Sequence, residues 1–496
     1  MGASKYKKLR SEEKIDGLSA KERQQNEALA KSKKEKKLYT IIGILVAVFI
    51  LAVVVLSSPL MTRGLPAAKV GSTSYSLADV RYASSSAYQS FSNNFGDYIS
   101  YILDPSVPLD EQECAYDPSM TWQEYFNQAG LDSLVYTTVM ENAAKEAGYT
   151  LSEGGQAEID STISMMELYG QMYGYSGDGF IALNYGEGNN EKTLRSMLEK
   201  VFLCDEYAQT KQKSFTYTDD QLDSYYAENA NSFNTVSTLY YSIPAVEDTE
   251  AGLDAEAAMA QAAETKDAIL AAYEEGGKTA EAFSDAVLSV TGEEATESNL
   301  TVSGTADAEW FASADRTEGE VFVSEEETAI RLYCYLTLED NQYNTVSVRH
   351  ILIQCQDADG DGEYSDDEKK AAEDALNEVI AQWDGSEENF IELANQYSED
   401  SGSNTNGGLY EKISKGSMVD EFDAFCFSGA KPGDTKVVYG SNGGYAGYHF
   451  IYFVGEGSLY SRVLADNDMR SQDYSDWYNE ISEGYEATTT FLYRYA

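Results

Sequence analysis

The chain has few of the side chains on which most enzyme chemistry depends. Its 496 residues include two histidines and five cysteines, and no two cysteines have CxxC spacing. Such scattered cysteines predict neither a thiolate metal site nor a disulfide framework, and their odd number leaves at least one thiol without an intramolecular partner. Lys and Arg total 35 against 84 Asp and Glu, a net charge of −49. Because so acidic a chain repels polyanions, we predict no nucleic-acid binding.

The N-terminal segment is the exception to this acidity. Residues 1–37 carry 12 Lys or Arg against 6 Asp or Glu, and residues 38–56 then follow without a single charge. A helix of that length crosses a hydrocarbon core of about 30 Å. Basic residues before such a stretch favour a cytoplasmic N-terminus and an extracytoplasmic remainder. We therefore predict a cytoplasmic tail (1–37) and a single-pass transmembrane signal anchor (38–57) in the cell membrane.

A cleaved signal peptide is the alternative for this segment. The basic part is longer than in most signal peptides, and the residues after the apolar stretch offer no clear small-residue cleavage site. Both features favour an uncleaved anchor.

Apolar residues three and four apart predict a mainly helical module over residues 65–230. Residues 457–496 are again helical in pattern, and we expect them to pack on this module. One stretch of the module is rich in methionine and tyrosine, namely Met165, Met166, Tyr169, Met172 and Tyr173. We expect these side chains to pack between helices, and the alternative is a soft, adaptable apolar surface.

An internal repeat follows the helical module. The string FNTVSTLYYSI begins at Phe233 and YNTVSVRHILI begins at Tyr343, an offset that places Tyr240 opposite His350. Such self-similarity is typical of duplicated domains. Chance similarity between short strand-like strings is the alternative.

The ends of the two copies also match. A Gly turn followed by an apolar alternating run occurs in both, and an alignment with a short gap places Leu332 opposite His449. We predict two related domains, 231–341 and 342–456, of which the first has lost its site. The first copy keeps its strand pattern without histidine. This favours a functional site over two satisfied core histidines in the second copy.

Five motifs of the second copy occur in an order typical of one enzyme family. They are RHILI, FIELANQYSEDSGSNTNGGLY, KGSMVDEFDAFCF, KPGD and GYHFIYF. In order and spacing they resemble the parvulin family of peptidyl-prolyl cis/trans isomerases. The arrangement around them is similar to the SurA/PrsA-like extracytoplasmic foldases, with a membrane-tethered helical chaperone module and inserted parvulin domains.

The resemblance implies an α+β fold in which helices wrap a four-stranded antiparallel sheet. It also implies isomerisation of Xaa-Pro bonds without a cofactor, on unfolded or partly folded secreted polypeptides outside the membrane of a Gram-positive-type bacterium. A homodimer is left open. The alternative is a catalytically inactive chaperone or scaffold that uses both parvulin-like domains only for binding.

Site residues follow from the same motifs. The resemblance implies a catalytic network of His350, Asp400 and His449. It implies an apolar pocket for the proline ring, formed by Met418 and Phe422.

The pocket departs from the family pattern at one wall. The family commonly has Gly-Asp-Leu-Gly-aromatic where this chain has residues 408–412, so Tyr410 replaces a leucine that lines the pocket. We expect activity to survive, and its strength is left open.

The acidic segment 357–368, DADGDGEYSDDE, fits the calcium-loop template D-x-D-x-D-G-x₅-E. The predicted ligands are Asp357, Asp359, Asp361, the Glu363 carbonyl, Ser365 and Glu368. The alternative is an acidic solvated turn in which Ser365 caps the following helix.

Overall fold

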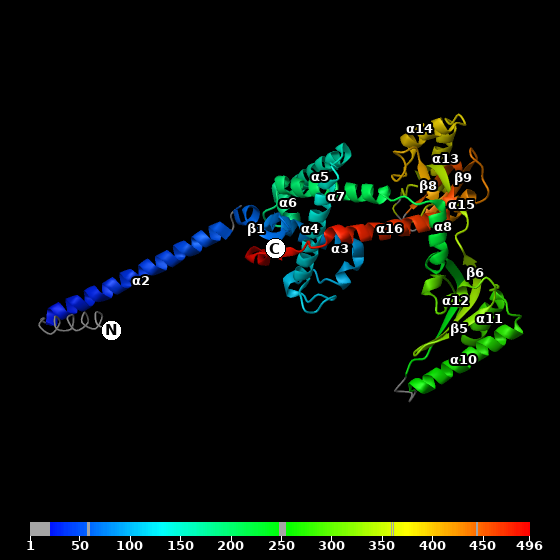
Figure 1. Cartoon of the computed structure of the whole chain (residues 1–496), viewed down its shortest axis with the longest axis horizontal. Coiled ribbons are helices and arrows are strands. Elements are labelled where there is room, and N and C mark those ends of the chain that lie inside the picture. Colours follow the sequence, from blue (N-terminus) through cyan, green and yellow to red (C-terminus); the bar gives the residue numbers. More distant parts are fainter. Residues whose placement is uncertain (1–19, 57–59, 248–253, 359, 361, 443–444) are drawn as a thin grey trace. The chain divides into compact units, whose positions relative to one another are not determined.

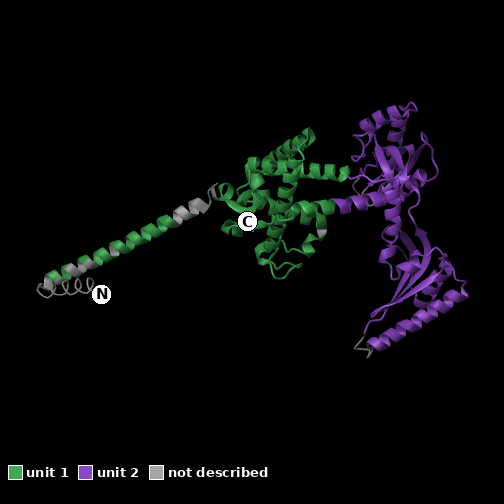
Figure 2. Cartoon of the chain, viewed as in Figure 1, with its two compact units in different colours: residues 1–214, 474–496 green, residues 215–473 purple. Residues whose placement is uncertain are grey.

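The computed structural model describes residues 20–56, 60–247, 254–358, 360, 362–442 and 445–496. These residues form two compact units, residues 1–214 with 474–496 and residues 215–473 (Figure 2). Helices predominate, and three antiparallel sheets accompany them, so the predicted α+β class is confirmed.

The first unit is mainly helical (Figure 1). Its elements are α2 (Ala20–Leu56), η1 (Leu60–Gly64), β1 (Pro66–Val70), β2 (Thr73–Ser76), α3 (Leu77–Phe95), η2 (Gly96–Tyr101), η3 (Leu109–Glu111), α4 (Trp122–Glu146), α5 (Glu153–Met172), α6 (Gly177–Tyr185), α7 (Glu191–Ser214), the C-terminal part of α16 (Tyr460–Ser482), β11 (Ala487–Thr489) and η5 (Phe491–Tyr495). Helix α3 begins where the sequence signals it, because the Ser76 and Asp79 side chains each accept a hydrogen bond from the other's backbone N–H.

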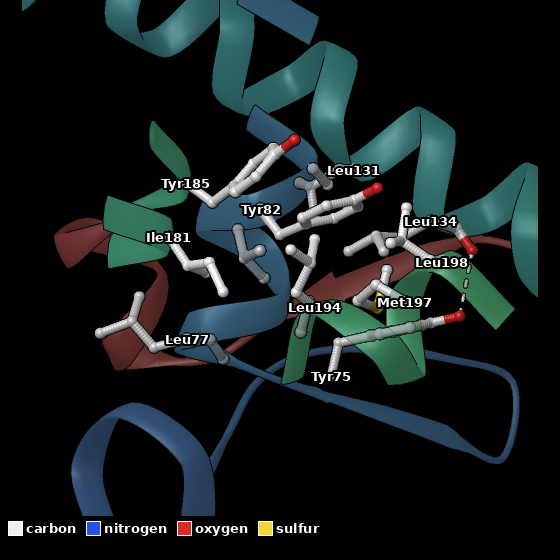
Figure 3. Close-up of a cluster of buried hydrophobic side chains, with 14 of the residues drawn as sticks. Tyr75, Leu77, Tyr82, Leu131, Leu134, Ile181, Tyr185, Leu194, Met197 and Leu198 are labelled. Atoms are coloured by element: carbon white, nitrogen blue, oxygen red, sulfur yellow. Dashed lines mark hydrogen bonds between the residues drawn. The ribbon is translucent and has the colours of Figure 1, made fainter. Parts of the chain in front are cut away.

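The core of this unit joins segments that are far apart in the chain. Strand β1 pairs with β2 on one side and with β11 on the other. Helices α3 and α4 pack closely because Gly130 of α4 leaves room for the backbone of Ser84. Figure 3 shows the buried side chains around Tyr75, whose hydroxyl oxygen is 3.4 Å from the carbonyl oxygen of Leu134.

Helix α2 contains most of the predicted membrane anchor. Position 57 and the side chains of residues 49–60 lie outside the described residues. Within the part of the chain that the structure describes, no helix combines the length and apolar composition needed to cross a bilayer. The anchor at 38–57 stays a prediction from the sequence.

The methionine- and tyrosine-rich stretch does not pack as expected. Helix α5 buries Ile159 and Ile163, and only Met166 of the predicted set packs partly against this core. The remaining four, Met165, Tyr169, Met172 and Tyr173, are exposed. Helix α5 is therefore apolar on two faces, and the prediction of interhelical packing is wrong for most of this set.

The second unit contains two four-stranded sheets. The first sheet and the helices that precede and accompany it comprise α8 (Asp219–Glu228), α9 (Ala230–Phe233), β3 (Thr235–Pro244), α10 (Ala255–Glu275), α11 (Ala280–Thr291), β4 (Thr296–Thr301), η4 (Val302–Gly304), α12 (Ala308–Ala312), β5 (Val321–Glu325) and β6 (Ala329–Glu339). The second comprises β7 (Asn344–Gln354), α13 (Asp366–Ile380), α14 (Glu387–Tyr397), β8 (Leu409–Ile413), α15 (Asp420–Cys426), β9 (Thr435–Asn442) and β10 (Tyr445–Leu459).

The two sheets have the same topology. Their strand orders are β4-β3-β6-β5 and β8-β7-β10-β9, and all neighbours are antiparallel. In each sheet the first strand of the copy pairs with the last, and two helices follow the first strand. This shared order is what a duplicated domain produces.

The register corrects one position of the predicted repeat. Tyr240 lies opposite Tyr333, just as His350 lies opposite Ile451. Counting two residues back along β6 and β10 places Arg331, and not Leu332, at the position of His449. Leu332 packs against the helices, because successive strand residues face opposite sides of the sheet.

Candidate functional site

The two histidines project from neighbouring central strands of the second sheet. His350 on β7 lies opposite Ile451, and His449 on β10 lies opposite Leu352. The histidines are thus diagonal neighbours on one face, and such pairs are within reach of ring side chains. Their Nδ1 atoms are 3.2 Å apart, and the ring planes differ by 13°.

Asp400 completes a chain of contacts with the histidines. Its Oδ2 lies 2.9 Å from Nε2 of His350. A carboxylate accepts hydrogen bonds, so Nε2 of His350 carries a proton, and in the tautomer with that single proton Nδ1 is an acceptor. His449 then donates from its Nδ1, which leaves its Nε2 free to accept. In this arrangement both hydrogen bonds, from His449 to His350 and from His350 to Asp400, are donated in the direction of the carboxylate.

Three hydroxyl groups extend this network at both ends. The hydroxyl of Tyr410 donates to Oδ2 of Asp400 at 3.1 Å, and Ser403 donates to the same oxygen. At the other end the hydroxyl of Tyr445 is 3.4 Å from Nε2 of His449. Two of these hydroxyls therefore stabilise the carboxylate, and the third faces the acceptor nitrogen of His449.

The protonation states follow from burial and from these contacts. The hydrogen bond from His350 holds the pKa of Asp400 well below its usual range, so this group is a carboxylate at neutral pH. Burial lowers the pKa of His449 from 6.5 to about 4, which keeps its ring neutral. Burial, together with the negative charge of Asp400, raises the pKa of Tyr410.

An open cavity of about 340 Å³ lies beside the network. Both histidines and Asp400 line it. Met418 and Phe422, the predicted proline pocket, lie on the wall formed at and before α15, and Tyr410 of β8 also lines the cavity. All six side chains predicted for catalysis and proline binding are therefore brought together around one cavity.

Phe422 fixes the histidines in place. It is buried, and its ring centroid lies 5.5 Å from each imidazole in edge-on geometry. An apolar ring packed on both imidazoles excludes water from them, which accounts for the lowered pKa of His449.

Two glycines let the loop after α14 approach β7. Gly408 has a φ of 71°, and a Cβ atom there would lie 2.2 Å from the carbonyl oxygen of His350. The carbonyl of Gly408 instead accepts a hydrogen bond of 2.9 Å from the backbone N–H of His350. The Gly407-Gly408 pair, which the first copy lacks, therefore allows the loop that carries Asp400 to close on the histidine strand.

No cysteine lines this cavity. All five cysteines are buried and free, and burial raises the pKa of Cys426 to about 12. A thiol with so high a pKa is not an activated nucleophile.

Sequence reasoning missed several residues of the cavity. Beyond the predicted set, its lining includes Leu352, Gln354, Glu399, Ser401, Val419 and Tyr445. Tyr445 was detectable, because it precedes His449 by four residues and so faces the same side of its strand. Ser403 gives no comparable signal, since its contact with Asp400 depends on the fold of a loop.

The predicted calcium loop is only partly described. Asp359 and Asp361 lie outside the described residues. Asp357 accepts hydrogen bonds from the backbone N–H groups of Gly360 and Gly362, at 2.6 and 3.0 Å. Glu363 lies in the same loop before the helix.

The end of this loop caps helix α13. Ser365 and Glu368 form a capping box, and Glu368 also accepts from the N–H of Ala358 at 2.7 Å. Among the described residues, no group of three or more acidic, histidine or cysteine side chains is arranged to hold a metal ion. Calcium binding therefore stays a prediction.

A comparison with known protein families identifies the cavity-bearing region. Residues 331–452 match the family described as PPIC-type PPIASE domain. The chain therefore contains a parvulin-type rotamase domain, and the resemblance to this family is confirmed. A search of curated proteins found no match.

Solved structures of PrsA proteins are also similar to parts of the chain. PrsA from Bacillus cereus is 23% identical over 29% of this chain and 49% of its own, with a TM-score of 0.19. PrsA from Bacillus subtilis is 15% identical over 76% of this chain and 91% of its own, with a TM-score of 0.29. Foldase protein PrsA from Streptococcus pneumoniae is 11% identical over 74% of this chain and 84% of its own, with a TM-score of 0.22. This chain thus spans about half of the Bacillus cereus protein and 59% of PrsA from Bacillus anthracis.

Proposed function

We propose that this chain, which carries a PPIC-type domain, is a peptidyl-prolyl cis/trans isomerase that acts as a foldase on unfolded proteins. The observation that carries the proposal is the buried His350–His449 contact, tied to Asp400 and placed beside an apolar cavity. A hydrogen-bonded network next to an apolar slot suits a reaction that rotates a bond and breaks none.

Binding of the proline ring is the first part of the mechanism. Met418 and Phe422 give the cavity an apolar wall, and a pyrrolidine ring gains free energy when its carbons leave water there. Held by its ring, the substrate can rotate only the acyl side of the Xaa-Pro bond.

The polar network acts on the rotating bond. Uncatalysed rotation has a barrier of about 18–20 kcal/mol, because the amide loses its resonance when it twists. Twisting moves negative charge off the carbonyl oxygen and leaves a lone pair on the proline nitrogen. His350, His449 and the Tyr hydroxyls form a preorganised polar surface that favours this redistribution over the planar ground state.

An isomerisation assay tests the proposal. A short Xaa-Pro peptide should isomerise faster with the full chain, and the His350→Ala variant should lower kcat/KM by roughly 10²-fold. Arg331→Ala, at the equivalent position of His449 in the first copy, is the control and should leave the rate unchanged. If the full chain accelerates nothing above buffer, the alternative of a non-catalytic binding protein takes its place.

The cellular setting belongs to the same proposal. We place the foldase outside the cytoplasm, held at the membrane by residues 38–57, because an uncharged stretch follows a basic segment. Its substrates are then secreted polypeptides that fold after they cross the membrane. Fractionation of cells with protease added from outside should degrade the part of the chain after residue 57 and protect the tail.

A further inference from the structure

The strongest feature outside the cavity is the exposed apolar face of the α5–α6 hairpin, residues 153–185. Monomeric soluble proteins rarely expose a large continuous apolar patch without a function. Met172 and Tyr173 are 68% and 69% exposed, and Leu168 is 56% exposed.

Helical geometry gathers these side chains on one stripe of α5. Met165, Leu168, Tyr169 and Met172 are three, four and seven residues apart, so they share one face. The buried residues Ile159 and Ile163 occupy a different face and pack into the core. The side chains of the exposed stripe therefore do not contribute to the buried core of this unit.

The turn between the helices holds the patch together. The Tyr173 ring stacks on Phe180 of α6 with a 6.0 Å centroid separation and a 6° angle. Gly170 permits this close approach, because a Cβ there would lie 3.1 Å from Cβ of Phe180.

Helix α6 extends the apolar surface into a cavity. Leu183 lies one turn after Phe180 and is 61% exposed. It lines a cavity of about 510 Å³ together with Tyr88 and Phe126. Ser84, whose Oγ is buried and has no hydrogen-bond partner, lines the same cavity. A polypeptide lying along the patch therefore meets further apolar side chains, Leu183 and Tyr88, at this cavity.

The negative charge of the hairpin favours a ligand that carries basic side chains. Residues 153–185 include five Asp or Glu and no Lys or Arg. Glu158 precedes Met165 by seven residues and so lies at the end of the exposed stripe. Among the described ion pairs, the one that brings a cation to this hairpin joins Arg195 of α7 to Asp160.

We propose that the α5–α6 patch binds unfolded client segments that combine apolar and basic side chains. Methionine and tyrosine adapt to varied apolar partners, and the acidic residues favour Lys or Arg beside them. A second copy of this chain would bring an equally acidic hairpin against the first, and a bilayer surface favours basic flanks that this hairpin lacks. The inference rests on the client-binding part of the proposed function.

The test uses the full chain and two labelled, unstructured peptides. They share the same Leu and Phe positions, and one carries Arg where the other carries Glu. We expect the Arg peptide to bind more tightly, and the double variant Met172→Ser/Tyr173→Ser to weaken its binding roughly tenfold. Because the double variant removes the Tyr173–Phe180 stack, Met172→Ser alone is measured beside it and should weaken binding while it keeps the Tm of the wild type. Leu288→Ser, an exposed apolar site on α11, is the matched control and should bind normally.

Glu158→Lys separates charge from apolar contact. It should remove the preference for the Arg peptide while leaving the apolar patch intact. Equal binding of both peptides by the wild type, or unchanged binding by the double variant, would overturn the proposal. The proposal would also be overturned if the double variant altered only the sedimentation mass of the protein, which indicates self-association. The same holds if it altered only binding to anionic vesicles, which indicates a membrane surface. Isomerisation of a short Xaa-Pro peptide is measured in parallel, so that loss of that activity is distinguished from loss of this site.

Discussion

The two sheets of the second unit share one scaffold and differ at its centre. Both have the same strand order, and in each a phenylalanine of the short helix before the last two strands is buried, Phe311 on α12 and Phe422 on α15. Around Phe422 lie the two histidines, whereas around Phe311 lie Trp310 and Phe322, with ring centroids 4.8 and 5.3 Å away.

The polar pair at the centre also differs. In the first sheet Tyr240 and Arg331 occupy the positions of the histidines, and Arg331 forms an ion pair with Glu326. The fold therefore tolerates very different side chains at these two positions. The same strand order is thus built without histidine in the first sheet, which supports the proposed role of the histidines in the second.

Exchanging the central pair should have the largest effect. The double variant His350→Tyr/His449→Arg carries the first sheet's pair in the second sheet. We expect it to lose isomerase activity by at least roughly 10²-fold, because the variant lacks the two stacked imidazoles and their acceptor nitrogen, and a guanidinium has no acceptor atom. Circular dichroism checks that the variant folds, and the smaller change His350→Gln/His449→Gln, which buries no charge, should lose activity as well. Full activity in this variant would contradict the proposed role of the histidines.

The buried phenylalanines allow the next test, with each as the control for the other. Phe311→Ala and Phe422→Ala should each destabilise the chain by about 3–5 kcal/mol, because each leaves a cavity in a packed core. Only Phe422→Ala should also slow isomerisation, since only Phe422 lines the cavity beside the histidines. Denaturant unfolding and kcat/KM give the two readouts. Equal losses of activity in both variants would show that destabilisation alone is responsible.

Acid should destabilise the second sheet specifically. Burial lowers the pKa of His449 from 6.5 to about 4. Between these values the unfolded chain binds a proton that the folded chain does not, so stability falls as pH decreases from 6.5 to 4. The loss reaches about 3 kcal/mol at the lower end.

Chemical unfolding at several pH values measures this loss. The His449→Gln variant should show a flatter pH dependence than the wild type across that interval, and isomerase activity of the wild type should fall near pH 4. Parallel curves for the two proteins would argue against a neutral, buried His449.

The smallest expected effect concerns the acidic loop before α13. The first sheet has no segment that fits the calcium template, so binding would belong to the second copy alone. Calorimetry should show saturable calcium heat at millimolar concentration, which Asp357→Ala abolishes. Asp384→Ala, in an Asp-Ser turn elsewhere in the domain, should keep it. No heat from the wild type would leave the loop as a helix-capping turn.

The sequence was sufficient to identify six of the side chains that line the cavity of the second sheet, because its motifs preserve the alternation of the strands. The predicted equivalence of Leu332 and His449 is wrong because the two copies were aligned by residue identity across a gap. An alignment error of one residue moves a side chain to the other face of a sheet.

Other features depend on three-dimensional packing that periodicity does not encode. Helix α5 has two apolar faces, and spacing alone does not say which one the core covers. The contact of Ser403 with Asp400 likewise depends on how the Gly407-Gly408 loop closes on β7.

The pairing of β1 with β11 has a consequence for biosynthesis. Thr490, just after β11, donates its hydroxyl to the carbonyl of Pro66, 424 residues earlier. At about 5–20 residues per second, a ribosome needs tens of seconds to make the intervening chain. During that time the inserted second unit is complete and can fold, while β1 still lacks one neighbour. The nascent chain therefore exposes an unpaired strand edge for that interval, and such an edge can pair with other chains until β11 is made.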